Sequence, residues 1–246
     1  MIKNADGAPE NLEAILKTAR NNIQLFEKVA ERKFLEFFKQ VKNSTMCSMP
    51  ALYDLYLSIK YINQARIPGD VVEIGCWKGG SMAMALLTDT SRTRHVVGFD
   101  TFEGHFEPPS EEIDIRGHNM QKRWRELNEV GIPWNKAEYG ECCEFLESIV
   151  EGQTSRFELV RGDINQTAFE FTPREISLLR IDCDWYKESL TSLEVFWPML
   201  SRGGVLILDD YGHHPGQMQA VTEFFMDNPI KITHVDYSCV SIIKPV

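Results

Sequence analysis

Short β-rich segments alternate with helix-like segments from residue 71 onward, and this alternation constrains the fold more than any other feature. The β-rich segments comprise residues 71–75, 95–100, 157–163, 177–184 and 203–210, and the clearest helical segments between them comprise residues 81–88, 137–150 and 187–200. Such an order predicts a mostly parallel, doubly wound α/β sheet. Two further candidates, 231–238 and 239–246, join closely around Ser238 and indicate an antiparallel pair at one edge. We therefore expect seven strands.

The first 66 residues predict helices outside the sheet. Apolar residues recur at helical spacing from Leu12 to Val41, which predicts one long amphipathic helix or two. A second helical segment, 49–65, leads into the first strand. We expect residues 1–66 to form an extension that packs on the core or makes a homo-oligomer contact, and residues 67–246 to form the main domain.

One long irregular stretch, residues 101–137, interrupts the alternation and is rich in Pro, Gly, His and acids. Ordered loops of this length are usually lids or binding loops, so we expect this one to cover an acceptor. It carries His105 and His118. For both histidines a solvated loop position is favoured over a contact with the acceptor.

The composition is that of a globular protein with a small-molecule partner. The chain has 246 residues, is 43% hydrophobic and 25% charged, and carries a formal net charge of −10, which argues against a nucleic-acid partner. We expect no membrane span and no signal peptide, and hence a cytoplasmic location. Six cysteines without CxxC spacing favour reduced, mostly buried thiols over a disulfide framework or a zinc site.

Two apolar runs each end in a pair of acids. Leu178–Ile181 precedes Asp182 and Asp184, and the run ending at Leu208 precedes Asp209 and Asp210. Carboxyl ends of parallel strands meet at one edge of a sheet, where open α/β folds bind ligands, so a divalent metal is the natural counterion for these four acids.

Helix capping is the alternative role for these acids. Asp184 is placed to cap a helix starting near Tyr186, and Asp210 is placed to cap one near Pro215. Four acids exceed that need, so we favour a metal or catalytic site.

A glycine turn follows the first strand in VVEIGCWKGGSM. Gly75 and Gly79 allow close approach of a ligand to the backbone, although a tight strand-to-helix turn explains them as well. Asp100 ends the second strand about 25 residues later, where nucleotide-binding α/β folds keep an acid for ribose hydroxyls. Asp163 follows the third strand, where it could meet the adenine end of the same ligand or simply end a turn.

Taken in order, VVEIGCWKGGS, FDTFEG, RIDCDWYKES and LDDYG resemble the TylF/macrocin O-methyltransferase family of class I S-adenosylmethionine-dependent enzymes. The resemblance spans residues 46–246, and its specific part is the pair DCDWYxS and LDDY. It implies a Rossmann-like methyltransferase fold and Mg²⁺-dependent methylation of a sugar hydroxyl, on a natural-product glycoside or an activated sugar. The chain departs from the family where HFEPP follows FDTFEG, and we therefore expect a specialised lid and acceptor pocket. It also departs where RGDINQTAF follows the third strand, which weakens the assignment of Asp163 to the cofactor.

The resemblance also implies roles for single residues. Asp182, Asp209 and Asp210 would bind Mg²⁺, and Asp184 would be the general base. The implied contacts to S-adenosylmethionine come from the glycine turn and the strand ends: Glu73, Gly75, Gly79, Ser81, Asp100, Asp163 and Asp182.

The implied chemistry needs both a cation and a base, because an alcohol hydroxyl, with a pKa of roughly 16, is a poor nucleophile at neutral pH. The same metal logic would serve a catechol or other aromatic diol, which is the alternative acceptor. A non-catalytic, cofactor-binding assembly module is the alternative from another class of protein. The four intact acids argue against it.

Overall fold

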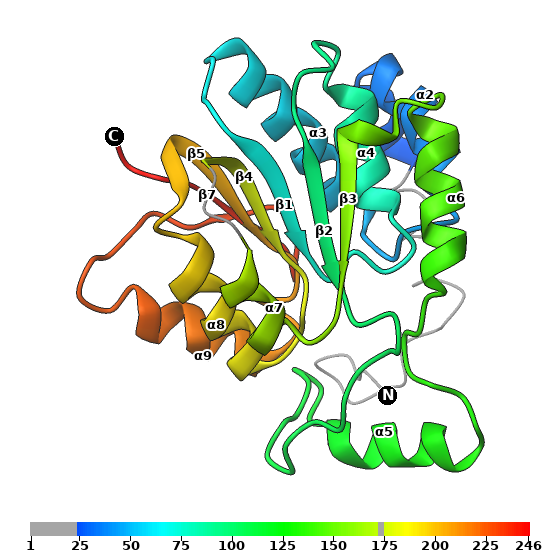
Figure 1. The fold of residues 1–246 in the computed structure, drawn as a ribbon. Coiled ribbons are helices and arrows are strands. Elements are labelled where there is room, and N and C mark those ends of the chain that lie inside the picture. The colour runs from blue at the N-terminus through cyan, green and yellow to red at the C-terminus, as the bar shows by residue number, and fades with distance from the viewer. Residues whose placement is uncertain (1–23, 172–174) are drawn as a thin grey trace.

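A computed structural model describes residues 24–171 and 175–246, and one seven-stranded sheet forms its centre (Figure 1). The strand order is β3-β2-β1-β4-β5-β7-β6. The strands are β1 (Asp70–Ile74), β2 (Val96–Asp100), β3 (Phe157–Arg161), β4 (Ile176–Ile181), β5 (Leu200–Leu208), β6 (Thr233–His234) and β7 (Val240–Ile243).

The first five strands are parallel, and β7 pairs antiparallel with both β5 and β6. The seven expected strands and the antiparallel edge are therefore confirmed. The order reverses between β1 and β4, so the carboxyl ends of these two strands flank the switch point at which doubly wound sheets bind ligands.

Helices cover both faces of the sheet (Figure 1). They are α2 (Arg32–Val41), α3 (Met49–Gln64), α4 (Gly80–Thr88), α6 (Tyr139–Ile149), α7 (Ile164–Glu170), α8 (Tyr186–Phe196) and α9 (Pro215–Phe224). Helix α5 (Met120–Glu129) lies apart from both faces, beyond the ends of the strands (Figure 1). Alternate strand residues face opposite layers: Val71 packs with α2, α3, α4 and α6, whereas Val72 packs with α7, α8 and α9.

The N-terminal segment splits into two helices within the described residues. Residues 24–29 are helical, the helix ends before Glu31, and α2 follows. Phe34, Phe37 and Val41 of α2 are buried in the same core cluster as the strands, so this part of the extension packs on the main domain. The expected helical positions 12–23 lie outside the described residues.

The stretch 101–137 is not irregular throughout, because it contains α5. Asn119 begins this helix by accepting a side-chain hydrogen bond from the backbone N–H of Lys122. All six cysteines are free, three of them buried. No helix among the described residues is both long and apolar enough to cross a membrane.

Candidate functional site

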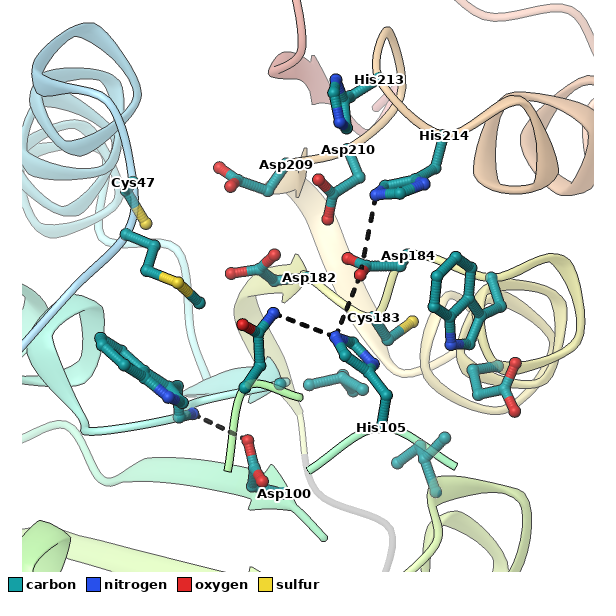
Figure 2. Close-up of a pocket in the computed structure, with 18 of the residues that line it drawn as sticks. Cys47, Asp100, His105, Asp182, Cys183, Asp184, Asp209, Asp210, His213 and His214 are labelled. Carbon is teal, nitrogen blue, oxygen red and sulfur yellow. Dashed lines mark hydrogen bonds and ion pairs between the residues drawn. The ribbon is translucent and has the colours of Figure 1, made fainter. Parts of the chain in front are cut away.

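A cavity of about 530 Å³ lies at the carboxyl ends of β1, β2, β4 and β5. Its walls also include the α2–α3 connection at Cys47, the lid segment around His105, and the turn before β7 at Ser238. Figure 2 shows the acids and histidines that face this space. Segments far apart in sequence therefore close around the strand ends.

The four predicted acids all line this cavity, two after β4 and two after β5 (Figure 2). β4 ends at Ile181, and Asp184 adopts a left-handed conformation with φ of 61°, so the strand does not persist to Asp184. This turn, rather than strand alternation, directs Asp184 into the cavity. A non-glycine residue in this region carries strain of order 1–3 kcal/mol and is often found at functional sites.

The capping alternative is wrong. The N-cap residues are Trp185 for α8 and His214 for α9, and neither helix receives a hydrogen bond from its N-cap side chain. A lid residue takes part of this role, because Oε1 of Glu112 lies 3.4 Å from the backbone nitrogen of Tyr186. Glu112 also lies against the start of α9, where a Cβ added to Gly216 would be 2.8 Å from its carboxylate oxygens.

Arg180 supplies a protein cation beneath the acid cluster. It is buried, and its guanidinium lies 2.5 Å from Glu73, 2.8 Å from Asp182 and 2.9 Å from Asp209. Sequence reasoning missed this residue, although an arginine within a buried strand run is itself a signal of a paired internal charge. Arg180 offsets part of the negative charge that was expected to require a metal.

The other pair of acids lies further from Arg180. Asp210 has one buried carboxylate oxygen without a hydrogen-bond partner, and burial together with the charge of Asp184 raises the pKa of Asp210 well above its ordinary value. Burial also raises the pKa of Asp209 to about 6, against the opposing effect of Arg180. Ionising these acids together is therefore costly unless a further cation binds.

The donor atoms fall into two sets, each within 4.8 Å. One set comprises Cys47, Asp182 and Asp209, and the other comprises Asp184, Asp210 and His214. The three predicted metal ligands are thus divided between the sets. Carboxylate oxygens dominate both, which suits a hard cation such as Mg²⁺, and the unpartnered oxygen of Asp210 is available to it.

Two imidazoles contact Asp184 at the same oxygen. Its Oδ2 lies 3.2 Å from Nε2 of His105 and 3.7 Å from Nε2 of His214 (Figure 2). Burial alone would raise the pKa of the Asp184 carboxyl, but the imidazoles of His105 and His214, together with a hydrogen bond to Asp210 and the nearby His213, outweigh burial and lower it. The carboxylate form favoured here is the one that can accept a proton.

The two lid histidines differ in environment. The side chain of His105 is 18% exposed and faces the cavity, so its expected solvated position is wrong. The side chain of His118 is 62% exposed and pairs with Asp114 outside the cavity, so its expected solvated position is confirmed. The sequence alone could not tell the environment of His105 from that of His118, because each depends on how the lid folds over the cavity.

The glycine turn brings the two halves of the site together. Gly75 has φ of 83°, and a Cβ at this position would lie 1.8 Å from the carbonyl oxygen of Asp182. Only glycine fits there. Gly75 lines the cavity, whereas Gly79 is the left-handed N-cap of α4 and packs near Cys142 instead.

Glu73 and Ser81 do not line the cavity. They are buried and bond to each other at 2.5 Å, and Glu73 also pairs with Arg180. Burial raises the pKa of Glu73 to about 7, although Arg180 opposes the shift. In this structure the side chains of Glu73 and Ser81 therefore stabilise the glycine turn from within the protein interior, away from the cavity.

Asp100 and Asp163 both line the cavity at its β2–β3 side. Asp100 accepts hydrogen bonds from the backbone N–H groups of Trp77 and Phe102, each at 2.8 Å. Asp163 caps α7 through a 2.9 Å bond from the backbone N–H of Asn165. Its turn role is therefore present, and its side chain also borders the space for a ligand.

The sequence is similar to those of two named O-methyltransferases. One is the 8-demethyl-8-(2,3-dimethoxy-alpha-L-rhamnosyl)-tetracenomycin-C 4'-O-methyltransferase of Streptomyces olivaceus, 30% identical over 68% of this chain and 62% of that protein. Another is the mycinamicin III 3''-O-methyltransferase of Micromonospora griseorubida, 29% identical over 73% of this chain and 69% of that protein.

The fold has solved counterparts as well. The O-methyltransferase NovP aligns with a TM-score of 0.69 at 22% identity, over 82% of this chain and 83% of that one. The sheet and its surrounding helices are those of the class I methyltransferases. The macrocin-O-methyltransferase (TylF) family matches residues 19–244, and the chain belongs to that family.

Proposed function

We propose that this chain transfers a methyl group from S-adenosylmethionine to a sugar hydroxyl, on a natural-product glycoside or an activated sugar, with Mg²⁺ bound by Asp182, Asp209 and Asp210. Asp184 is the general base. The proposal is supported by the family match and by relatives named as methyltransferases of rhamnosyl and other natural-product substrates. The chain spans 62% of the first of these relatives, so its activity and acceptor are inferred rather than carried over.

The observation that carries the proposal is the placement of an ionised Asp184 beside a cluster of acids that lacks sufficient counter-charge. The imidazoles lower the pKa of Asp184, whereas burial raises that of Asp210. One carboxylate is thus poised to accept a proton, and the others favour a cation. Bound Mg²⁺ would supply positive charge that makes a nearby hydroxyl more acidic.

The chain's own residues would complete the reaction. Asp184 takes the hydroxyl proton as the oxygen–methyl bond forms and the sulfur–methyl bond breaks, which leaves neutral S-adenosylhomocysteine. Gly75 lets the cofactor approach the end of β4, and Asp100 lies at the end of β2 where the ribose hydroxyls are expected. The lid around His105 limits the access of water.

The test uses purified protein, methyl-labelled S-adenosylmethionine and a panel of nucleotide sugars, glycosides and catechols. Transfer to sugars should stop in EDTA and return with Mg²⁺. Turnover that survives complete metal removal would contradict the metal role. A preference for catechols would instead support the aromatic-diol alternative, and binding of cofactor and Mg²⁺ without transfer to any acceptor would support a non-catalytic module.

The base is tested with Asp184→Asn. Loss of a general base typically lowers the rate by about 10²–10⁴-fold, and affinity for S-adenosylmethionine measured by calorimetry should be unchanged. The exposed Asp227→Asn is the matched control. Loss of cofactor binding in Asp184→Asn would assign Asp184 to the cofactor site instead.

A further inference from the structure

His105 is a lid residue whose side chain contacts the acid cluster, at Asp184. Its backbone is fixed on both sides: its N–H donates to the carbonyl of Trp134 at 3.0 Å, and its own carbonyl accepts from Nε1 of Trp124 at 2.7 Å. The preceding Gly104 has φ of 85° and passes so close to Trp134 that a Cβ would lie 2.5 Å from the Trp134 carbonyl oxygen. The lid therefore holds His105 in one place.

The imidazole ring is also fixed. It makes edge contacts with Trp134 at 5.1 Å and Trp185 at 5.3 Å between ring centroids. The Nδ2 atom of Asn135 lies 3.1 Å from Nε2, beside the 3.2 Å contact with Asp184. Aromatic edges on two sides and polar groups at one end leave the ring a single orientation.

We propose that His105 is a positioning residue for Asp184, and that closure of the lid aligns the base. A carboxylate attracts an N–H and repels a lone pair, so Nε2 carries the proton and donates it to Oδ2 of Asp184. The Asn135 amide beside it must then present its oxygen, and not its nitrogen, to the same N–H. Both histidines approach this same oxygen of Asp184, so the other oxygen faces Asp210 and the acceptor hydroxyl. This inference rests on the proposed role of Asp184 as general base.

The left-handed backbone of Asp184 explains why it needs such a partner. The carboxyl group lies beyond the end of β4 and outside any helix, so no regular hydrogen-bond ladder fixes it. His214 approaches the same oxygen from the main domain at 3.7 Å, and His105 adds the shorter contact of 3.2 Å from the lid. The lid contact is present only when residues 101–105 cover the cavity, so alignment of the base would accompany closure.

A matched set of variants tests the proposal. The amide nitrogen of Gln reaches the position of Nε2, whereas that of Asn reaches only the position of Nδ1. We expect His105→Asn and His105→Ala to lower kcat by about 10–100-fold, as is typical for residues that orient a reacting group. His105→Gln should retain most of the kcat, and imidazole added to His105→Ala should restore part of it in a saturable manner.

His118→Asn is the control, because His118 also pairs with an aspartate in the lid but faces solvent. It should keep wild-type kcat and KM. For every His105 variant the affinity for S-adenosylmethionine should stay near the wild-type value. The Tm should fall most in His105→Ala, because the ring also packs against Trp134 and Trp185, so kcat is compared at a temperature at which every variant is folded.

A double-mutant cycle separates this inference from the proposed function. If His105 acts through Asp184, His105→Ala should have no further effect in the Asp184→Asn background. Inactive Asp184→Asn with wild-type kcat in His105→Asn overturns the positioning role alone. Wild-type activity in Asp184→Asn overturns the general base. Equal losses in the Gln and Asn variants, together with lower cofactor affinity, also overturn positioning, because they would indicate a general disturbance of the lid.

Discussion

Replacing Arg180 with Met should reveal how much of the acid cluster depends on a protein cation. Methionine fills much of the space of the arginine stem but leaves Glu73, Asp182 and Asp209 without the guanidinium that now lies within 2.9 Å of each. In metal-free protein at least one more carboxyl must then hold a proton. The pKa of Asp209 is about 6 in the wild type, so holding a proton there costs about 1.4 kcal/mol at pH 7. Loss of the ion pairs themselves adds to this cost, and removal of one member of a buried ion pair typically costs roughly 3–5 kcal/mol.

The stability of Arg180→Met relative to wild type should decrease as the pH rises. Above about pH 6 the folded variant binds one proton more than the folded wild type, whereas the two unfolded chains bind the same number, so the stability of the variant relative to wild type should fall by about 1.4 kcal/mol for each further pH unit. The deficit should therefore be about 1.4 kcal/mol larger at pH 7 than at pH 5. Urea denaturation in EDTA, followed by tryptophan fluorescence, measures it, with the exposed Arg202→Met as control. Added Mg²⁺ should narrow the difference. A deficit below about 1 kcal/mol at pH 7, or one that is equal at pH 5 and pH 7, would refute the reasoning.

Three further predictions concern stability. Burial raises the pKa of Asp54 to about 6, and this half-buried acid keeps one oxygen unpaired, so wild-type stability is lost as pH rises from about 4 to 6. Asp54→Asn should therefore be more stable by about 1–2 kcal/mol at pH 7.5, and equal below pH 4, in denaturant titrations. Gly75→Ala should lower both Tm and cofactor affinity, because its Cβ meets the Asp182 carbonyl; wild-type values would contradict the close approach. Phe34→Ala should cost about 3–5 kcal/mol, since this ring is fully buried against the main domain, and a change under 1 kcal/mol would mean that α2 is not part of the core.

Most of the fold could be predicted because its signals are local. The apolar runs of β1, β4 and β5 and the amphipathic spacing of α3 are visible in short windows of sequence. Helix α5 was missed because it is short and mostly polar, and only its first residue, Met120, is buried. Its position depends on packing under Trp134, which no local pattern reports.

The candidate site could be predicted only in part. Strand order brings Asp182 and Asp209 together wherever β4 and β5 are neighbours, so these acids follow from topology. The roles of Arg180 and His105 do not follow from it. The role of Arg180 depends on which face of a buried strand carries the charge. The role of His105 depends on how the long lid folds over the cavity.

The contact between Glu112 and the start of α8 holds the lid against the main domain. The Glu112 carboxylate lies beside the N-termini of α8 and α9, and swinging the lid away would return these helix ends to water. A helix cap contributes about 1 kcal/mol, so the contact with Tyr186 would favour the shut position by roughly 5-fold. Glu112 does not line the cavity, so opening of the lid would depend on a residue outside the site. A substitution at Glu112 would then change how readily the lid opens without changing the residues that carry out the reaction.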